Sequence, residues 1–249
     1  PGAGALDRGV ALEPREGGAL SIRTPDGAVA QGTITQWVDD QTVGFRVPAG
    51  SNPGPNDTVL TLSIEPHQVG REVTIVQQIP TPHVAAMVAV GWDACLVALS
   101  YLDRGEAIPQ FPPEVAVFED VITQLGQDQP ELQPIPGGTR IRFDRQTLLQ
   151  PLEKVWSVMT AGVPLKEGDF APPTFTGSSD SGRISILTPP TELEYLTADG
   201  GRVKWRFHEH FGSARINLQI AVPRAVDAEA AAALWQQHLT AVVARIIAA

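Results

Sequence analysis

The chain encodes one long amphipathic helix twice, and this repeat constrains the fold more than any other feature. Segment 227–249 places apolar side chains on a single helical face, at spacings of four, three and four: Trp235, Leu239, Val242 and Ile246. Segment 84–102 carries the first three of these positions 143 residues earlier: Trp92, Leu96 and Leu99. The segments that precede the two helices should therefore be related as well.

The strand-like segments before each helix repeat in the same way. At the offset of 143, Leu60, Leu62 and Ile64 align with Val203, Trp205 and Phe207. Further upstream the offset becomes 150: Ile34, Val43 and Phe45 align with Ile184, Leu193 and Tyr195. The change falls in the Pro-, Gly- and Asn-rich segment 48–56, where a difference in loop length costs little. A repeat of about a hundred residues indicates two diverged domains and not a solenoid.

The order of elements predicts an α+β fold. In each copy, segments with alternating apolar and polar residues predict antiparallel strands, and the long helix follows them. This order is typical of a curved sheet wrapped around a C-terminal helix. We predict a first domain over residues 1–105 and a Pro-rich linker over 106–138. The linker contains a short helix whose apolar face carries Val117, Val121 and Leu125. The second domain, 139–249, opens with a strand and a short helix that begins near Pro151.

Composition excludes several classes of partner and site. The net charge of −10 and the absence of a Lys/Arg cluster argue against nucleic acid or an anionic membrane as a partner. The single cysteine, Cys95, rules out an internal disulfide and is typical of a reducing compartment. No run of eighteen apolar residues and no signal-like start is present. We therefore expect a cytoplasmic protein with no membrane partner.

Several motifs resemble the START/Bet v-like helix-grip (SRPBCC) superfamily. Residues 151–160 (PLEKVWSVMT) are similar to the opening helix of that superfamily, and residues 186–195 (ILTPPTELEY) to its central strand pair. Residues 91–99 (GWDACLVAL) resemble a helix of the branch that contains the homologues of heat-shock-protein ATPase activators. Residues 15–18 (REGG) and 24–27 (TPDG) also resemble sequences of that branch. Together the matches extend over most of the chain outside the linker.

This resemblance implies two helix-grip domains, each with an apolar cavity between the long helix and the concave sheet. Family members bind lipids, hormones, polyketides or co-chaperone clients, and a minority are cyclases or aromatases. Copy one departs from the family because the counterpart of residues 140–162 would fall mostly before Pro1. Truncation, disorder and natural loss remain open explanations. We expect the incomplete first domain to leave a sheet edge uncovered, where a partner surface is one way to complete it.

Aromatic residues on the inward faces are the candidate ligand-binding residues. In copy two they are Trp156, Tyr195, Trp205, Phe207 and Trp235, together with Leu239; in copy one they are Trp92 and Leu96. Aromatic residues at such spacings are more often plain core than binding residues. In this fold, however, the core and the cavity lining are the same surface, so both interpretations stay open.

Reactive groups give no comparable signal. His208, Glu209 and His210 suggest a metal pair, but their place beside a hairpin turn favours solvated turn residues. Glu192 and Glu194 alternate outward on a strand and are expected to be a solvated edge. Cys95 has no nearby His or Lys in sequence and is expected to be an inert residue of the core. We therefore expect no catalytic residue, no metal and no cofactor.

The sequence is compatible with three functions. The leading hypothesis is non-catalytic binding of an apolar small molecule, lipid-like or polyketide-like, in one or both domains. The alternative is a protein-interaction module that resembles the co-chaperone ATPase activators and uses the exposed sheet of the first domain; a protein partner or a homodimer would then be involved. The third is a cyclase or aromatase, for which His208 and Arg206 are the nearby polar candidates. Both alternate away from the face of Trp205, which counts against catalysis.

Overall fold

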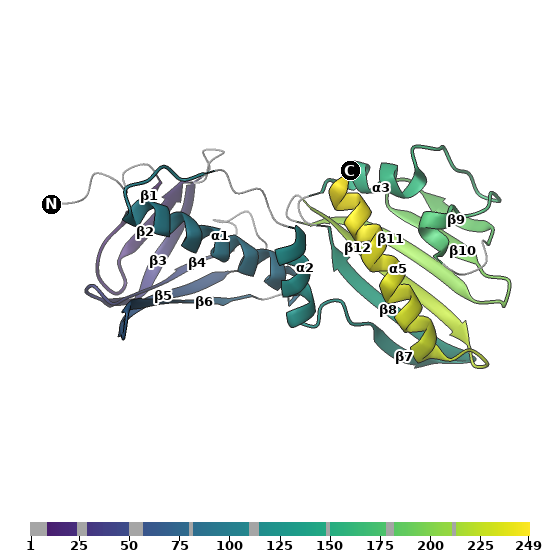
Figure 1. Cartoon of the computed structure of the whole chain (residues 1–249), viewed down its shortest axis with the longest axis horizontal. Coiled ribbons are helices and arrows are strands. Elements are labelled where there is room, and N and C mark those ends of the chain that lie inside the picture. The colour runs from purple at the N-terminus through teal and green to yellow at the C-terminus, as the bar shows by residue number, and fades with distance from the viewer. Residues whose placement is uncertain are drawn as a thin grey trace. The chain divides into compact units, whose positions relative to one another are not determined.

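The computed structural model describes residues 9–23, 29–49, 57–79, 82–109, 115–147, 150–177, 182–210 and 213–249. The chain divides into two compact units, residues 1–82 and residues 83–249. Each unit contains one antiparallel sheet of six strands, and the helices are few (Figure 1). The predicted α+β class is therefore confirmed. Two segments named in the sequence analysis lie outside the described residues. They are 24–27, which carries part of the family resemblance, and 50–56, which is most of the loop where the repeat offset changes.

The first unit is an antiparallel meander in which every strand pairs with the next one in sequence. Its strands are β1 (Val10–Leu12), β2 (Ala19–Arg23), β3 (Val29–Val38), β4 (Thr42–Val47), β5 (Thr58–His67) and β6 (Gly70–Gln78). Its core is small and is formed by Leu20, Ala30, Ile34 and Val47, with Trp37 and Phe45 packed against them. The side chains of β5 and β6 become progressively more exposed toward the hairpin that joins the two strands.

The second unit holds the other six-stranded sheet and the five described α-helices. Its strands are β7 (Glu131–Ile135), β8 (Gly138–Gln146), β9 (Ile184–Thr188), β10 (Glu192–Leu196), β11 (Arg202–His210) and β12 (Ser213–Pro223), in the order β7-β8-β12-β11-β10-β9. Its helices are α1 (Ala85–Asp103), α2 (Val115–Gln124), α3 (Leu152–Thr160), α4 (Pro173–Thr176) and α5 (Ala228–Ala248), and the short 3-10 turn Pro82–Val84 leads into α1.

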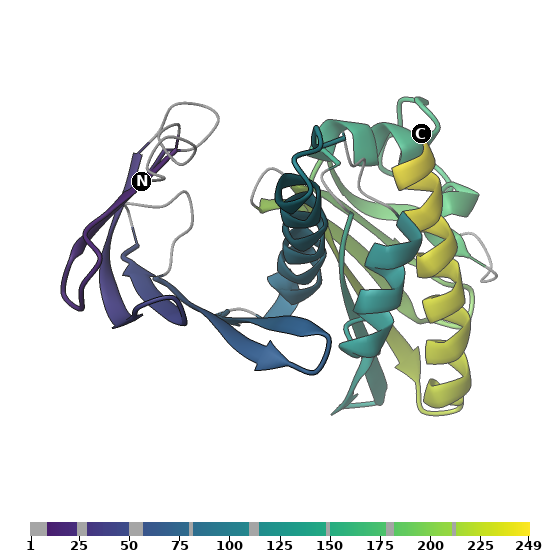
Figure 2. The same ribbon diagram turned by 60° about the vertical axis from the view of Figure 1, so that its left-hand side comes forward.

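Helix α5 lies across the face of this second sheet (Figure 2). Asp227 caps its N-terminus by accepting hydrogen bonds from the backbone N–H groups of Glu229 and Ala230, at 3.0 and 3.1 Å. The apolar stripe predicted from the sequence faces the sheet, because Trp235, Leu239 and the other stripe residues are at most 8 % exposed. This burial joins helix and sheet in one core cluster, as a helix-grip fold requires.

The strand and helix succession recurs at the spacing seen in the sequence. Strand β5 begins at Thr58 and β11 at Arg202; β6 begins at Gly70 and β12 at Ser213; α1 begins at Ala85 and α5 at Ala228. Sheet one, however, holds no counterpart of β8 among the described residues, since it ends at β6. The expectation that copy one lacks its opening strand and helix stays a prediction.

Residues 106–138 contain more structure than a tether. Helix α2 buries Phe118 and Ile122 against Ala86 of α1, whereas Val117 and Leu125 are exposed. Val121 of the predicted face packs against this cluster, so the buried face of α2 is shifted by about one position from the predicted one. Strand β7 also lies within this segment and pairs with β8. The predicted first domain, 1–105, includes α1, which the structure groups with the second unit through its contacts with α2; the predicted domain boundaries stay predictions.

Helix α1 is the most exposed long apolar segment that the structure describes. Ala86 is its one fully buried residue, and Val97, Leu99 and Leu102 are 44 to 59 % exposed. Its mean hydropathy reaches 1.7 over an 18-residue window, so by length and composition it is one helix able to cross a membrane. The sequence screen for uninterrupted apolar runs missed it because Asp93 and Ser100 interrupt the segment. The expected absence of a membrane partner stays a prediction.

Candidate functional site

The interior of the second unit is a tightly packed aromatic cluster. Trp205 and Phe207 on β11 and Tyr195 on β10 are at most 1 % exposed. The ring of Phe175, from α4, lies edge-on to both Trp205 and Phe207, with centroid separations of 5.7 and 6.3 Å. Trp156 of α3 approaches the ring of Phe207 at 5.8 Å. Edge-to-face aromatic contacts at these separations are favourable beyond the area that they bury.

The short helix α4 fills the space between the long helix and the sheet. The carbonyl oxygen of Phe175 accepts hydrogen bonds from the Tyr195 hydroxyl at 3.1 Å and the Trp205 indole Nε1 at 3.0 Å. The Thr174 hydroxyl donates to the carbonyl of Met159. Since Phe175 is fully buried, its side chain occupies the place where the sequence predicted a ligand cavity.

His238 of α5 holds the other side of this segment. Its ring Nε2 lies 2.9 Å from the carbonyl oxygen of Thr174, so the neutral ring carries its proton on Nε2 and donates it. Burial lowers the pKa of His238 below its ordinary value, although the hydrogen bond to Thr174 acts in the opposite direction. Gly177 ends α4 with a positive φ, and a Cβ there would lie 3.0 Å from the imidazole. Glycine is therefore required at this turn.

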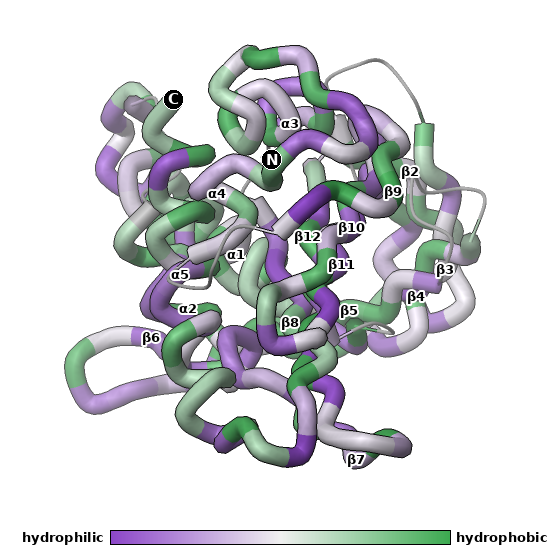
Figure 3. Tube along the Cα trace, turned by 90° about the vertical axis from the view of Figure 1, so that its right-hand side faces the viewer, coloured by the Kyte–Doolittle hydropathy of each residue, from purple (hydrophilic) through white to green (hydrophobic). Residues whose placement is uncertain are grey.

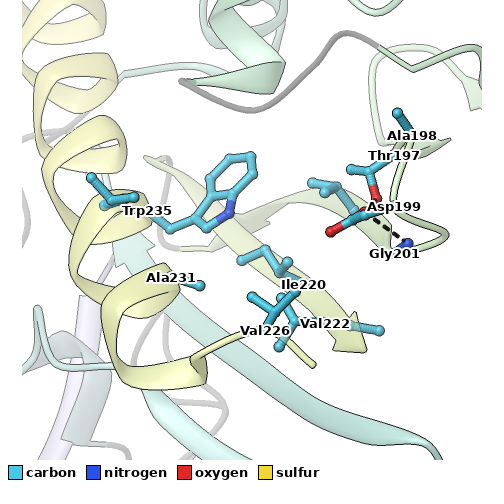
Figure 4. A pocket seen from close by; sticks show the side chains of 12 residues that line it. Thr197, Ala198, Asp199, Gly201, Ile220, Val222, Val226, Ala231 and Trp235 are labelled. Atoms are coloured by element: carbon cyan, nitrogen blue, oxygen red, sulfur yellow. Dashed lines mark hydrogen bonds between the residues drawn. The ribbon is translucent and has the colours of Figure 1, made fainter. Parts of the chain in front are cut away.

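An open cavity of about 290 Å³ lies at the end of the second unit where α5 begins. Helix α5 contributes one wall and β11, β12 and the turn after β10 contribute the others (Figure 4). The lining is mostly apolar and consists of Thr197, Ala198, Asp199, Gly201, Val203, Ile220, Ala221, Val222, Val226, Ala231, Leu234 and Trp235. In Figure 4 the indole of Trp235 extends from α5 toward the turn that carries Asp199.

Asp199 is the charged residue of the cavity lining. Its Oδ1 atom accepts hydrogen bonds from the Thr197 hydroxyl and from the backbone N–H of Gly201, the latter at 3.1 Å. The hydrogen bond from Thr197, reinforced by that from Gly201, lowers the pKa of the Asp199 carboxyl. The carboxylate is exposed and stays ionised, so the cavity combines apolar walls with one anionic group.

The predicted ligand-binding residues fall into three groups. Trp235 lines the cavity. A second group is packed in the core around α4: Trp156, Tyr195, Trp205, Phe207 and Leu239. The copy-one candidates Trp92 and Leu96 are half-buried on α1. A role of these residues in ligand binding stays a prediction.

The polar residues outside this interior form ion pairs. The Nζ atom of Lys204 lies 2.8 Å from Glu192 and 3.5 Å from Glu194, and Arg206 lies 2.9 Å from Glu192. Burial raises the pKa of Glu192, but the hydrogen bonds from Lys204 and Arg206 outweigh it and the pKa is lowered. Glu194 is 4 % exposed, so the expectation of a solvated edge was wrong for this residue.

The histidine cluster and the cysteine form no reactive site among the described side chains. His208 and Glu209 are exposed at the end of β11, and the side chain of His210 lies outside the description. No group of three potential metal ligands occurs among the described residues. Cys95 is exposed on α1, whereas the sequence suggested an inert core position.

Sequence reasoning missed the segment that determines the shape of the interior. Residues 161–177 carry no helical or strand periodicity, so α4 and Phe175 were not predicted. The sequence signals that do mark the segment are Pro172 and Pro173 at the start of α4 and Gly177 after its end, because proline is common at the first position of a helix and glycine just after the last. His238 was also missed, since nothing in its sequence context indicates a partner as distant as Thr174.

The family comparison matches the first copy. Residues 8–102 match the family described as "Activator of Hsp90 ATPase homolog 1-like protein". The predicted family resemblance is confirmed. The match covers less than half of the chain and ends within α1, so in sequence α1 continues the activator-homologue-like copy. No curated protein matches the chain.

Solved structures with a similar arrangement share little sequence with this chain. CalU16 from Micromonospora echinospora is 18 % identical, with 47 % of this chain and 85 % of that chain covered and a TM-score of 0.38. DynU16, from the dynemicin biosynthetic locus, is 10 % identical over 97 % of this chain and 86 % of its own, with a TM-score of 0.36. StfQ, a di-domain ARO/CYC from the steffimycin pathway, is 11 % identical over 96 % and 85 %, with a TM-score of 0.27. None of these similarities assigns a function.

Proposed function

We propose that the second unit binds an apolar small molecule in the cavity beside Trp235. The observation that carries this proposal is a cavity of about 290 Å³ with a mostly apolar lining, which remains open although Phe175 fills the interior next to Trp205. This volume lies near the lower end of ligand pockets, which span roughly 300–1,000 Å³. The ligand is therefore a small apolar molecule, or the end of a longer one such as a lipid-like or polyketide-like chain.

A fluorescence titration tests this proposal. The neutral probe N-phenyl-1-naphthylamine should gain fluorescence on binding to the wild-type chain. Ala231 lines the cavity from α5, so Ala231→Phe should fill it and weaken binding by about tenfold or more, which corresponds to ~1.4 kcal/mol. Ala230→Phe is the matched control, because Ala230 is exposed on the same helix. Equal affinity of the two variants would exclude this cavity as the site.

Native mass spectrometry of the purified chain supplies an independent measurement. A carried ligand adds mass to the folded protein that is lost on denaturation, and its value begins to identify the chemical class. The additional mass should disappear in Ala231→Phe and persist in Ala230→Phe. Additional mass that is unaffected by Ala231→Phe would place the ligand elsewhere in the chain.

A second candidate function is interaction with a chaperone of the Hsp90 type. It is supported by the family match over residues 8–102 and by the exposed apolar side chains of α1, among them Leu99. The chain would then stimulate ATP hydrolysis by such a chaperone, and Leu99→Asp would abolish the stimulation. An unchanged ATPase rate in the presence of the wild-type chain would exclude this function. We assign the protein to the cytoplasm in either case, in keeping with its single cysteine.

We further propose that the chain arose by tandem duplication of one helix-grip domain. The recurrence of β5, β6 and α1 as β11, β12 and α5 supports this origin. Nothing in the site favours the cyclase or aromatase hypothesis over binding: Arg206 is held by Glu192, and His208 is exposed away from the cavity.

A further inference from the structure

Strand β6 is the last strand of sheet one. It pairs with β5 in a continuous register from Val59↔Gln78 to His67↔Gly70, without a bulge. No other strand among the described residues pairs with its second edge. From Arg71 to Val76 that edge therefore presents peptide N–H and C=O groups to whatever lies beside it.

The second sheet shows what the same position accommodates. Strand β12 follows β6 at an offset of 143 residues and has neighbours on both edges, β11 on one side and β8 on the other. Strand β8 pairs with it antiparallel over nine residues, from Arg215↔Gln146 to Pro223↔Gly138. A strand of similar length and direction fits beside β6.

Strand β6 lacks two of the features that protect an edge strand from pairing, and its charges, Arg71 and Glu72, lie near one end of the strand. It contains no proline and no bulge, and Val73 and Val76 are 36 and 57 % exposed. The other edges that the structure describes are protected: β1 is three residues long, β7 carries Pro134, and the segment beside β9 is bridged by the pair Phe170↔Arg183. Figure 3 shows hydrophobic stretches within the hairpin of β6.

We propose that β6 pairs antiparallel with β6 of a second copy of this chain, about a two-fold axis at Thr74. The two six-stranded sheets then form one continuous sheet. A second copy of the chain is the proposed partner because it offers the same nine-residue edge strand, β6, with the same free edge. An isologous pairing of this kind is the commonest form of homodimer.

The sequence of β6 is self-complementary in this register. Val73 faces Ile75 of the other copy, and Thr74 faces its own counterpart. In this register, odd-numbered residues of one β6 lie opposite odd-numbered residues of the other, and even-numbered opposite even-numbered. Opposed residues share a face, so the apolar face of each sheet continues across the dimer. Glu72 faces Val76 of the other copy, and this contact provides a way to test the register by charge.

The test measures the mass of the full-length chain in solution by light scattering. The wild type should show twice the chain mass of 26.6 kDa. Val76→Glu places a new carboxylate opposite Glu72 of the other copy. This repulsive pair occurs twice because of the two-fold symmetry, so the variant should be a monomer. Adding Glu72→Lys to Val76→Glu creates two opposite-charge pairs and should restore the dimer. Val10→Glu, at the other edge of the same sheet and with Val10 41 % exposed, is the matched control and should leave the dimer intact.

A cross-link provides a second readout. In a Cys95→Ala background, Thr74→Cys should form a disulfide-linked dimer under mild oxidation, because residues directly opposite in antiparallel strands have Cβ atoms about 4.5–5.5 Å apart. Gln78→Cys in the same background lies off the two-fold axis and should not form that dimer. A monomeric wild type, a dimer unaffected by Val76→Glu, or cross-linking of Gln78→Cys in place of Thr74→Cys would each overturn the proposal.

Discussion

The indole Nε1 of Trp205 donates a hydrogen bond of 3.0 Å to the carbonyl oxygen of Phe175, thirty residues away in sequence. The two rings also pack edge to face, with centroids 5.7 Å apart. The strand that was expected to line a ligand cavity therefore holds a segment of the chain itself. This contact explains why the open cavity lies at the end of α5 and not at the centre of the sheet.

Removal of the Phe175 ring should be strongly destabilising. Phe175→Ala deletes a fully buried aromatic side chain and should lower the free energy of unfolding by about 3–5 kcal/mol, measured by urea denaturation. It should also create new space for an apolar probe next to Trp205. Phe170→Ala is the control, because Phe170 is 58 % exposed and its ring contacts Arg183 at the surface. A loss as small as that of the control would show that α4 does not anchor the interior.

The ion pair between Arg145 and Glu119 should contribute more than the other pairs. The Arg145 side chain is 2 % exposed and contacts both carboxylate oxygens of Glu119, at 2.6 and 2.8 Å. Glu119→Ala leaves a buried guanidinium without its counter-charge and should cost about 3–5 kcal/mol in urea denaturation. Glu131→Ala breaks the exposed pair with Arg142 and should cost ~0.5 kcal/mol or less. Similar losses for both variants would contradict this ranking.

Stability should depend on the protonation of His238. Because its pKa is lowered in the folded protein, the unfolded chain binds a proton at a higher pH than the folded chain does. The free energy of unfolding should therefore fall as the pH decreases from the ordinary value near 6.5 toward the lowered pKa, and become level below it. His238→Gln should flatten this part of the profile. Urea titrations on both sides of pH 6.5 measure it, and an unchanged profile would assign the dependence to other groups.

The carboxylate of Asp199 should set a preference among ligands of one chain length. The wild type should bind dodecylamine about two- to fivefold more tightly than dodecanoate, since an exposed charge contributes up to ~1 kcal/mol. Asp199→Asn keeps an acceptor for Thr197 and Gly201, so it should remove the preference without loss of fold. Competition against N-phenyl-1-naphthylamine measures both affinities. A preference that survives the substitution would mean that Asp199 does not contact the ligand head group.

The elements were predictable from the sequence where periodicity was strong. The stripe that contains Trp235 and Leu239 is buried as expected, and the alternation of apolar residues placed β11 and β12 correctly before the closing helix α5. The buried face of α2 was predicted about one position away from the observed one because the sequence of α2 is apolar on two sides. Packing against α1, which includes Ala86, selects Phe118 and Ile122 as the buried residues.

The candidate site was predictable only in part, because its shape depends on contacts between distant segments. Trp205 and Phe207 were correctly placed on the inner face of a strand, but their environment is decided by Phe175 from a four-residue helix. Glu194 is buried because the long side chains of Arg202 and Lys204 approach it from the neighbouring strand. Alternation along a single strand contains no information about such cross-strand cover.

The short helix that fills the interior also couples the internal volume of the second unit to its stability. Segment 161–177 follows α3 and enters the interior through Phe175, and its Phe170 forms a bridge with Arg183 just before β9. Exchange of the four α4 residues, Pro173–Thr176, for smaller side chains would therefore enlarge the interior and weaken the packing around Trp205 at the same time. A library confined to these four residues and screened for folded protein would measure how much internal volume the sheet tolerates before the core is lost.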